Sequence, residues 1–222
     1  MNNFIVIGVG GYARSGKNTF VDIASKIVNK AGYTSYSVSF GNALKQEVND
    51  MLIKNGFNSS TSAYTEDSEL KKILRPLLVW WGCQRRIESK DGLYWINHVN
   101  KQISDIVNIN NDKKVIFVSD VRFKNEAECI HNTWEGILVH LKRWENKELT
   151  NKDGIIPVKV YDDAPNEEER KQDPLVQEAS DYCIEWPNQK KSSVDAINEP
   201  ILKKIVLDTL NSMDYFIDLL LL

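Results

Sequence analysis

The sequence predicts an α/β protein whose mostly parallel sheet is covered by helices on both faces. Short apolar runs alternate along the chain with segments of helical periodicity, and glycine-rich or polar stretches separate them. The run Lys114–Ser119 (KVIFVS) is of the continuous apolar type that is typical of a strand buried in a parallel sheet. A chain of 222 residues with 42 % hydrophobic residues is long enough for one α/β core, so we expect a single domain over residues 1–222.

The first elements form a strand, a glycine turn and a helix. Residues 4–8 are an apolar run that ends in glycines, and from Lys17 apolar residues repeat at helical spacing until Gly32 offers a stop. Alternation over 33–40 predicts the second strand.

The next stretch is expected to be mainly helical. Apolar spacing predicts a helix over 43–52, and the Ser, Thr and Asn residues of 57–65 predict a loop. A helix is expected over about 67–82, where Pro76 begins a new segment or kinks the old one, and another over 93–107.

After the apolar strand at 114–119, the same alternation of elements continues. We expect a helix over about 123–132, strands over 136–141 and 182–186, and a closing helix from about 193. The polar stretch 142–180 is longer than an ordinary connection. It is interpreted either as a lid-like segment or as an acidic surface loop with a helix through NEEERKQDPLVQEA.

Charge and composition exclude several classes of protein. A formal charge of -3 argues against binding to a nucleic acid polymer, which broad Lys/Arg surfaces carry. The three cysteines have no metal-site spacing, and a reducing cytoplasm fits them best. No apolar run approaches the roughly 20 residues of a membrane span. The apolar end Leu219–Leu222 is expected to pack in the core or against a second copy in a homodimer.

The segment VGGYARSGKNTF, residues 9–20, nearly matches the phosphate-binding loop G-x-x-x-x-G-K-[S/T]. Gly11 and Gly16 allow main-chain N–H groups to turn toward an anion, and Lys17 can reach the outer phosphates of a triphosphate. Asn18 stands where the hydroxyl is usual, and Thr19 follows one residue late, an order similar to that of adenylate-kinase-like enzymes. A dinucleotide site is disfavoured because residues 23–46 contain no acidic residue to bind a ribose.

Asp120 ends the most apolar strand, where open parallel sheets place ligand-binding groups. A carboxylate at this point can orient Mg²⁺, and Thr19 can contribute an oxygen. Arg122, two residues later, can meet the transferring phosphoryl group. We therefore expect Lys17, Asp120 and Arg122 to be catalytic.

Five strings together resemble the deoxynucleoside monophosphate kinase family known best from bacteriophages. They run in family order, and they are GGYARSGKNTF (10–20), SFGNALK (39–45), RPLLVWWGCQRR (75–86) with YWI (94–96), DVRFKNEAE (120–128) and a weaker DYCIEWPN (181–188).

The resemblance implies a three-layer nucleoside monophosphate kinase-like fold with a phosphate-binding loop (P-loop), an acceptor-binding helical part over about 42–110 and a lid-like segment over about 142–180. ATP and Mg²⁺ are the implied cofactors, a deoxynucleoside monophosphate is the implied acceptor, and the cytoplasm, or the host cytoplasm for a phage-encoded protein, is the implied location. The implied ATP-binding residues are Gly11, Arg14, Ser15, Gly16, Lys17, Asn18 and Thr19. The implied acceptor-binding residues are Lys45, Arg75, Gly82, Trp95, Arg122 and Glu126.

Two other functions stay open at this point. One is a kinase for a hydroxyl acceptor, of the dephospho-coenzyme A kinase or polynucleotide kinase type, in which Asp120 would act as a base. The other is a non-catalytic protein that binds a nucleotide. The family's histidine-serine-glutamate element is not recognisable, and DAPNEEE at 163–169 is the candidate replacement.

Overall fold

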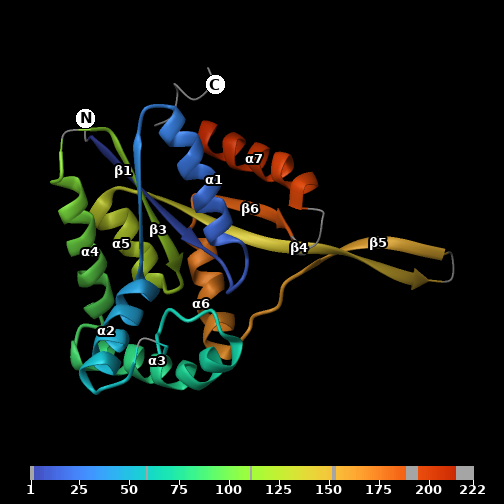
Figure 1. The fold of residues 1–222 in the computed structure, drawn as a ribbon. Coiled ribbons are helices and arrows are strands. Elements are labelled where there is room, and N and C mark those ends of the chain that lie inside the picture. Colours follow the sequence, from blue (N-terminus) through green and yellow to red (C-terminus); the bar gives the residue numbers. More distant parts are fainter. Residues whose placement is uncertain (1–2, 59, 111, 152–153, 189–194, 214–222) are drawn as a thin grey trace. The chain divides into compact units, whose positions relative to one another are not determined.

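The computed structural model describes residues 3–58, 60–110, 112–151, 154–188 and 195–213 (Figure 1). Its strands are β1 (Phe4–Gly10), β2 (Thr34–Ser39), β3 (Lys114–Val121), β4 (Ile137–Asn151), β5 (Gly154–Tyr161) and β6 (Tyr182–Pro187). Its helices are α1 (Lys17–Lys30), α2 (Phe40–Lys54), α3 (Ser68–Glu88), α4 (Tyr94–Val107), α5 (Lys124–Trp134), α6 (Glu167–Glu178) and α7 (Asp195–Asn211).

The described strands form one sheet in the order β2-β3-β1-β4-β5, with β6 also paired to β4. β1 pairs in parallel with β3 and β4, and β4 pairs in parallel with β6, whereas β5 is antiparallel to β4. The predicted α/β class with a mostly parallel sheet is therefore confirmed.

The two faces of β1 explain the layers around the sheet. Ile7 and Val9 point into a core that includes residues of α1 and α7. Gly8 and Gly10 point to the other face, where a methyl group on either would lie about 3 Å or less from Ile130 of α5 or Val176 of α6. Alternate residues of a strand face opposite sides, so glycine at every second position admits the two helices closely.

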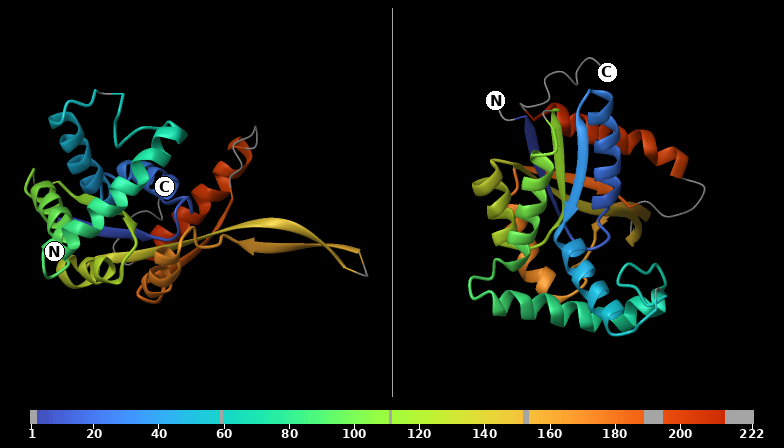
Figure 2. Two further views of the ribbon diagram at one scale, coloured as in Figure 1. Left: turned by 90° about the horizontal axis from the view of Figure 1, so that it is seen from below. Right: turned by 60° about the vertical axis from the view of Figure 1, so that its left-hand side comes forward.

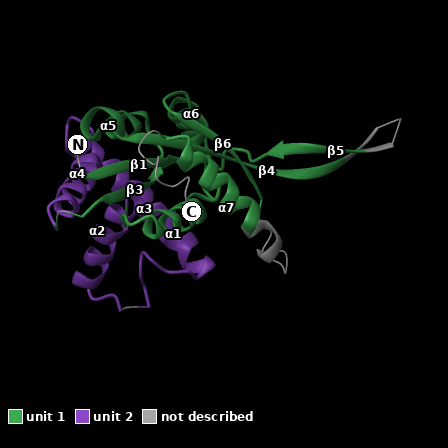
Figure 3. Ribbon diagram, turned by 90° about the horizontal axis from the view of Figure 1, so that it is seen from above, with its two compact units in different colours: residues 1–37, 110–222 green, residues 38–109 purple. Residues whose placement is uncertain are grey.

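Contacts divide the chain into two compact units, coloured separately in Figure 3. Unit 1 comprises residues 1–37 and 110–222 and carries the glycine loop, and unit 2 comprises residues 38–109. Within unit 2, helices α2, α3 and α4 pack on one another around a small core that includes Val48, Leu52 and Leu74. The expectation of a single domain over 1–222 stays a prediction.

Several boundaries differ from those expected. Helix α2 begins at Phe40, which the alternation had placed in a strand, because the Ser39 hydroxyl accepts a hydrogen bond from Asn42 N at 2.9 Å and caps the helix. Helix α3 continues through Pro76 to Glu88 as one element, beyond the expected end at residue 82.

The strand expected over 136–141 is longer in the structure. β4 continues to Asn151 and returns as β5, with Trp144 opposite Tyr161. This two-stranded ribbon runs on beyond β6, as Figures 1 and 2 show. The many charged residues of β4 hid the strand pattern. The expected helix through 166–179 is present as α6, and a lid function for 142–180 stays a prediction.

No described helix has the length and apolar character that crossing a membrane requires. The apolar residues Leu219–Leu222 lie outside the described part of the chain, so their expected packing stays a prediction.

Candidate active site

The loop between β1 and α1 has the backbone of an anion-binding turn. Gly11, Arg14 and Gly16 adopt positive φ angles of 123°, 69° and 96°, and Ser15 N donates to Tyr12 O at 3.1 Å. When residues with left-handed and right-handed backbone angles alternate, the N–H groups of successive residues point toward the same concave side of the turn, where they can bind an anion. Helix α1 begins directly after this turn and adds its positive end.

Both glycines of the motif are required by their surroundings as well as by their φ angles. A methyl group at Gly11 would lie 2.5 Å from Leu141 O, and one at Gly16 would overlap the Trp186 indole, 2.9 Å from Cδ1. Trp186 is almost fully buried in the core of unit 1 and cannot move aside. The loop is therefore confined by the main chain of β4 at Leu141 and by the side chain of Trp186 near the end of β6.

Lys17 is the first residue of α1 and is 8 % exposed. Its Nζ donates to Gly11 O and Tyr12 O, both at 2.7 Å. Burial lowers the pKa of Lys17, and the nearby Asp120 carboxylate opposes that shift. The ammonium group is thus held close to the concave side of the loop, where an anion would stabilise its charge.

Asp120 owes its position to an irregularity at the end of β3. Val9 pairs with Ser119 and Gly10 with Val121, so Asp120 is an extra residue with a φ of 79°. Such a bulge re-aims the side chain, and aspartate tolerates a left-handed backbone better than most residues. Its Oδ1 accepts from Arg122 Nε at 2.5 Å.

Arg122 is held from several sides. Its NH1 group donates to Glu169 Oε1 at 2.9 Å, and its own main-chain N donates to Glu126 Oε2 at 2.9 Å. Burial lowers the pKa of the guanidinium, but Asp120 and then Glu169 outweigh it, so the pKa of Arg122 is raised. Arg122 is therefore a fixed cation beside the loop.

Glu126 is 2 % exposed and is predicted from the resemblance to hold the acceptor. In the structure, its Oε2 also accepts from Phe123 N at 3.2 Å, at the start of α5. These contacts shape the turn that carries Arg122. A role of Glu126 toward the acceptor would thus act through the position of Arg122.

The remaining loop residues have different exposures. Ser15 is buried, and its Oγ has no hydrogen-bond partner, whereas Arg14 and Asn18 are exposed and Thr19 is half-buried. The Thr19 hydroxyl and the Asp120 carboxylate are hard oxygen donors of the kind that Mg²⁺ prefers. Among the described residues, no group of three or more His, Cys, Asp or Glu side chains is placed so that it could hold a metal ion.

Glu169 on α6 is a member of the site that the motifs did not single out. It is 8 % exposed, and its Oε2 accepts from Ala13 N of the loop at 2.8 Å while its Oε1 binds Arg122. Asn166 at the helix start also donates to Oε1, at 3.3 Å. The sequence placed Glu169 in the expected helix through NEEERKQDPLVQEA and in DAPNEEE at 163–169, the candidate replacement for the missing family element.

A pocket of about 270 Å³ in unit 1 adjoins the loop through Tyr12 and Ser15. Its polar side chains are engaged in pairs, since Arg143 Nε donates to Asp162 at 2.5 Å and His140 Nε2 lies 3.0 Å from Asp173 Oδ1. Sequence reasoning found no role for His140, because its partner lies 33 residues further along the chain.

The other predicted acceptor residues belong to unit 2. Trp95 is 2 % exposed, and its Nε1 donates to the carbonyl of Gly82 at 3.1 Å, so these two residues are in contact. The Lys45 ammonium lies 5.9 Å from the centre of the Tyr64 ring, and Arg75 is exposed on α3. The Trp95 ring is engaged in helix packing, and its expected role in binding the acceptor stays a prediction.

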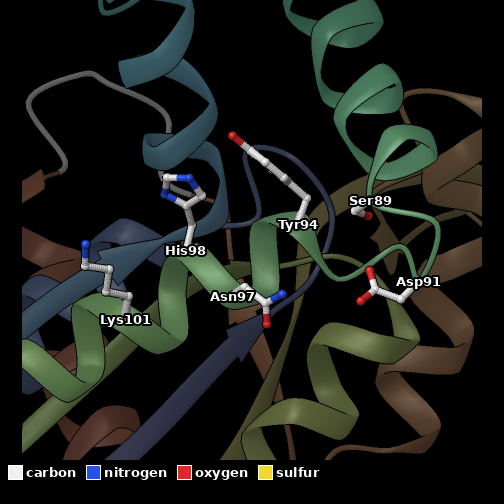
Figure 4. Close-up of a pocket in the computed structure, with 6 residues that line it drawn as sticks. All are labelled: Ser89, Asp91, Tyr94, Asn97, His98 and Lys101. Atoms are coloured by element: carbon white, nitrogen blue, oxygen red, sulfur yellow. The ribbon is translucent and has the colours of Figure 1, made fainter.

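Unit 2 also has an open pocket of about 470 Å³ at the start of α4, which Figure 4 shows. Its lining residues are Ser89, Asp91, Tyr94, Asn97, His98 and Lys101. None of them belongs to the predicted acceptor set. Glu47 accepts hydrogen bonds from the Tyr94 hydroxyl, from Trp81 Nε1 at 2.8 Å and from Arg85 Nε at 3.1 Å.

Comparisons with known proteins found a similarity in structure and none in sequence. No protein-family model matches the chain, and no curated protein matches it in sequence. Among solved structures, the chain is similar to a shikimate kinase from Acinetobacter baumannii in complex with shikimate, with 12 % identity and a TM-score of 0.40, over 94 % of this chain and 97 % of that one.

Proposed function

We propose that this protein is an ATP-dependent kinase that converts deoxynucleoside monophosphates to diphosphates. The observation that carries the proposal is the meeting of the glycine loop, Lys17, Asp120 and Arg122 in unit 1. β1 and β3 are parallel neighbours, so the groups that follow their carboxyl ends lie at the same edge of the sheet.

The loop and Lys17 would bind the phosphates of ATP, with Arg14, Ser15, Asn18 and Thr19 around them. Thr19 and Asp120 would hold Mg²⁺, which neutralises charge between the outer phosphates when it is bound. The positive φ angles, the buried Lys17 and the unpartnered Ser15 Oγ all fit a phosphate chain.

Arg122 would face the phosphoryl group during transfer. Asp120 fixes its orientation through Nε, and a pre-positioned cation stabilises the charge that develops between donor and acceptor. A phosphate acceptor is already ionised at neutral pH, so the reaction needs no general base. Asp120 is engaged with Arg122 at 2.5 Å, which favours an orienting role over a basic one.

The choice of a deoxynucleoside monophosphate as the acceptor rests on the five strings described above. Lys45, Arg75, Gly82 and Trp95 of unit 2 are assigned to the acceptor on the same basis, and Arg122 and Glu126 of unit 1 complete the set. The open pocket of unit 2 is not needed for this assignment.

The test is a coupled assay of ADP release with all deoxy- and ribonucleoside monophosphates and with a panel of hydroxyl acceptors. We expect release that depends on a deoxynucleoside monophosphate. Lys17→Ala and Arg122→Ala should each lower turnover by about 100-fold or more while the circular dichroism spectrum and melting temperature change little. Normal turnover by folded Lys17→Ala would remove the loop from the mechanism.

The same assay separates the two alternatives. ADP release only with hydroxyl acceptors, abolished in Asp120→Asn, would indicate a kinase in which Asp120 is a base. Asparagine tolerates the left-handed backbone at this position, so the variant isolates the charge. ATP binding without any acceptor-dependent release would indicate a non-catalytic nucleotide-binding protein.

A further inference from the structure

Glu169 places a negative charge at the site where a phosphate chain is proposed to bind. Its carboxylate accepts from Ala13 N of the glycine loop at 2.8 Å and from Arg122 at 2.9 Å. A main-chain amide of this loop and a guanidinium group are the donors that an anionic ligand would use. In the structure, a side chain of the protein itself uses both.

The ammonium group of Lys17 is also bound by the protein itself. Lys17 Nζ is bonded to two loop carbonyls at 2.7 Å, and the Glu169 charge is among those that favour its protonated form. Glu169 thus lies among the positive groups that a triphosphate would need. Two anions cannot share these donors without mutual repulsion in a buried site.

We propose that Glu169 is an internal competitor of the nucleotide: its carboxylate occupies the Ala13 amide and the Arg122 guanidinium until a phosphate chain displaces it. The inference depends on the part of the proposed function that assigns phosphate binding to the loop. Displacement frees Arg122 for the phosphoryl group, and it releases the start of α6 from the loop.

The position of Glu169 on α6 makes this exchange feasible. Asn166 Oδ1 accepts from Glu169 N at 2.8 Å, so the helix start keeps its cap when the carboxylate leaves. Glu167 and Glu168, the other acids of the first turn, are both exposed. Glu168 therefore offers a matched control with the same charge at the same helix end.

The test uses the full chain and isothermal titration with Mg·ATP, inorganic tripolyphosphate and uncharged adenosine. If about 90 % of the free protein has Glu169 on the loop, its removal should tighten apparent affinity about tenfold. We expect Glu169→Gln to tighten both phosphate ligands by about this factor and to leave adenosine binding unchanged. Glu168→Gln should behave as the unmodified protein.

The outcomes distinguish this inference from the proposed function. Unmodified protein that binds neither ATP nor tripolyphosphate would refute both. Unmodified protein that binds ATP, with Glu169→Gln equal to it or weaker, would refute only the competition and make Glu169 a support for the loop. Equal gains in Glu168→Gln and Glu169→Gln would indicate a general charge effect and would also overturn the proposal.

Discussion

The contact between Gly16 and Trp186 allows a quantitative prediction about the glycine loop. Gly16 has a φ of 96°, a region that costs an L-residue about 1–2 kcal/mol. A methyl group there would also overlap the indole of Trp186, which is 1 % exposed, and overpacking of this kind costs about 1–3 kcal/mol. Gly16→Ala should therefore lower the free energy of unfolding by about 2–5 kcal/mol.

Urea denaturation of the nucleotide-free protein measures this loss, and Gly32→Ala is the matched control. Gly32 also has a positive φ, of 86°, but no atom lies within 4 Å of the added methyl group. Gly32→Ala should therefore show the backbone term alone, about 1–2 kcal/mol. The difference between the two variants isolates the clash with Trp186.

A double-mutant cycle with Trp186→Val completes the test. Valine lacks the indole atoms Nε1 and Cδ1 that lie nearest Gly16, so Gly16→Ala should cost at least about 1 kcal/mol less in that background. Equal losses for Gly16→Ala and Gly32→Ala, or no coupling in the cycle, would show that the indole does not confine the loop.

Three further predictions concern titratable groups. Burial lowers the pKa of Lys17 below 10.5, so above that lowered pKa the binding of ATP takes up a proton. Titration calorimetry should therefore show that the affinity for ATP falls as the pH rises through the lowered pKa. Lys17→Arg should abolish this fall. Glu126→Ala leaves Arg122 N and Phe123 N without the carboxylate, so urea denaturation should show a loss of about 1–3 kcal/mol, smaller in Glu126→Gln. Burial raises the pKa of Glu47, but hydrogen bonds from Trp81, Tyr94 and Arg85 outweigh it, so the pKa is lowered. The stability that the ionised Glu47 contributes is present above pH 4.5 and is lost as pH falls through the lowered pKa. Glu47→Gln should therefore flatten the decrease of stability at acid pH, and an unchanged decrease would show that these hydrogen bonds do not cause it.

The sheet and the glycine loop could be predicted because each depends on local sequence. The apolar run before residue 120 predicted β3, and the glycines predicted a loop in which two of the three positive φ angles fall on glycine. The ribbon β4–β5 was missed for the opposite reason. Its two strands pair with each other, and the apolar residues Ile156 and Val158 of β5 are exposed, so they do not mark a buried face.

The geometry at Asp120 could be predicted only in part. Its place after an apolar strand follows from the sequence, but the direction of its side chain depends on the shifted register between β3 and Val9–Gly10 of β1. A bulge is a property of two paired strands. Neither strand sequence contains a signal that distinguishes it from regular pairing.

Glu169 shows how a local pattern can be correct and still give the wrong partner. Asn166 with glutamate three residues later is typical of a capping box, in which the glutamate returns to the N–H of its own helix start. Here the asparagine half is formed, but the carboxylate binds Ala13 N and Arg122 instead. Charge-assisted hydrogen bonds in a buried setting are stronger than a solvent-exposed cap, so the tertiary contacts prevail. Three consecutive glutamates are chemically identical, and only the phase of α6 against the loop decides which one enters the site.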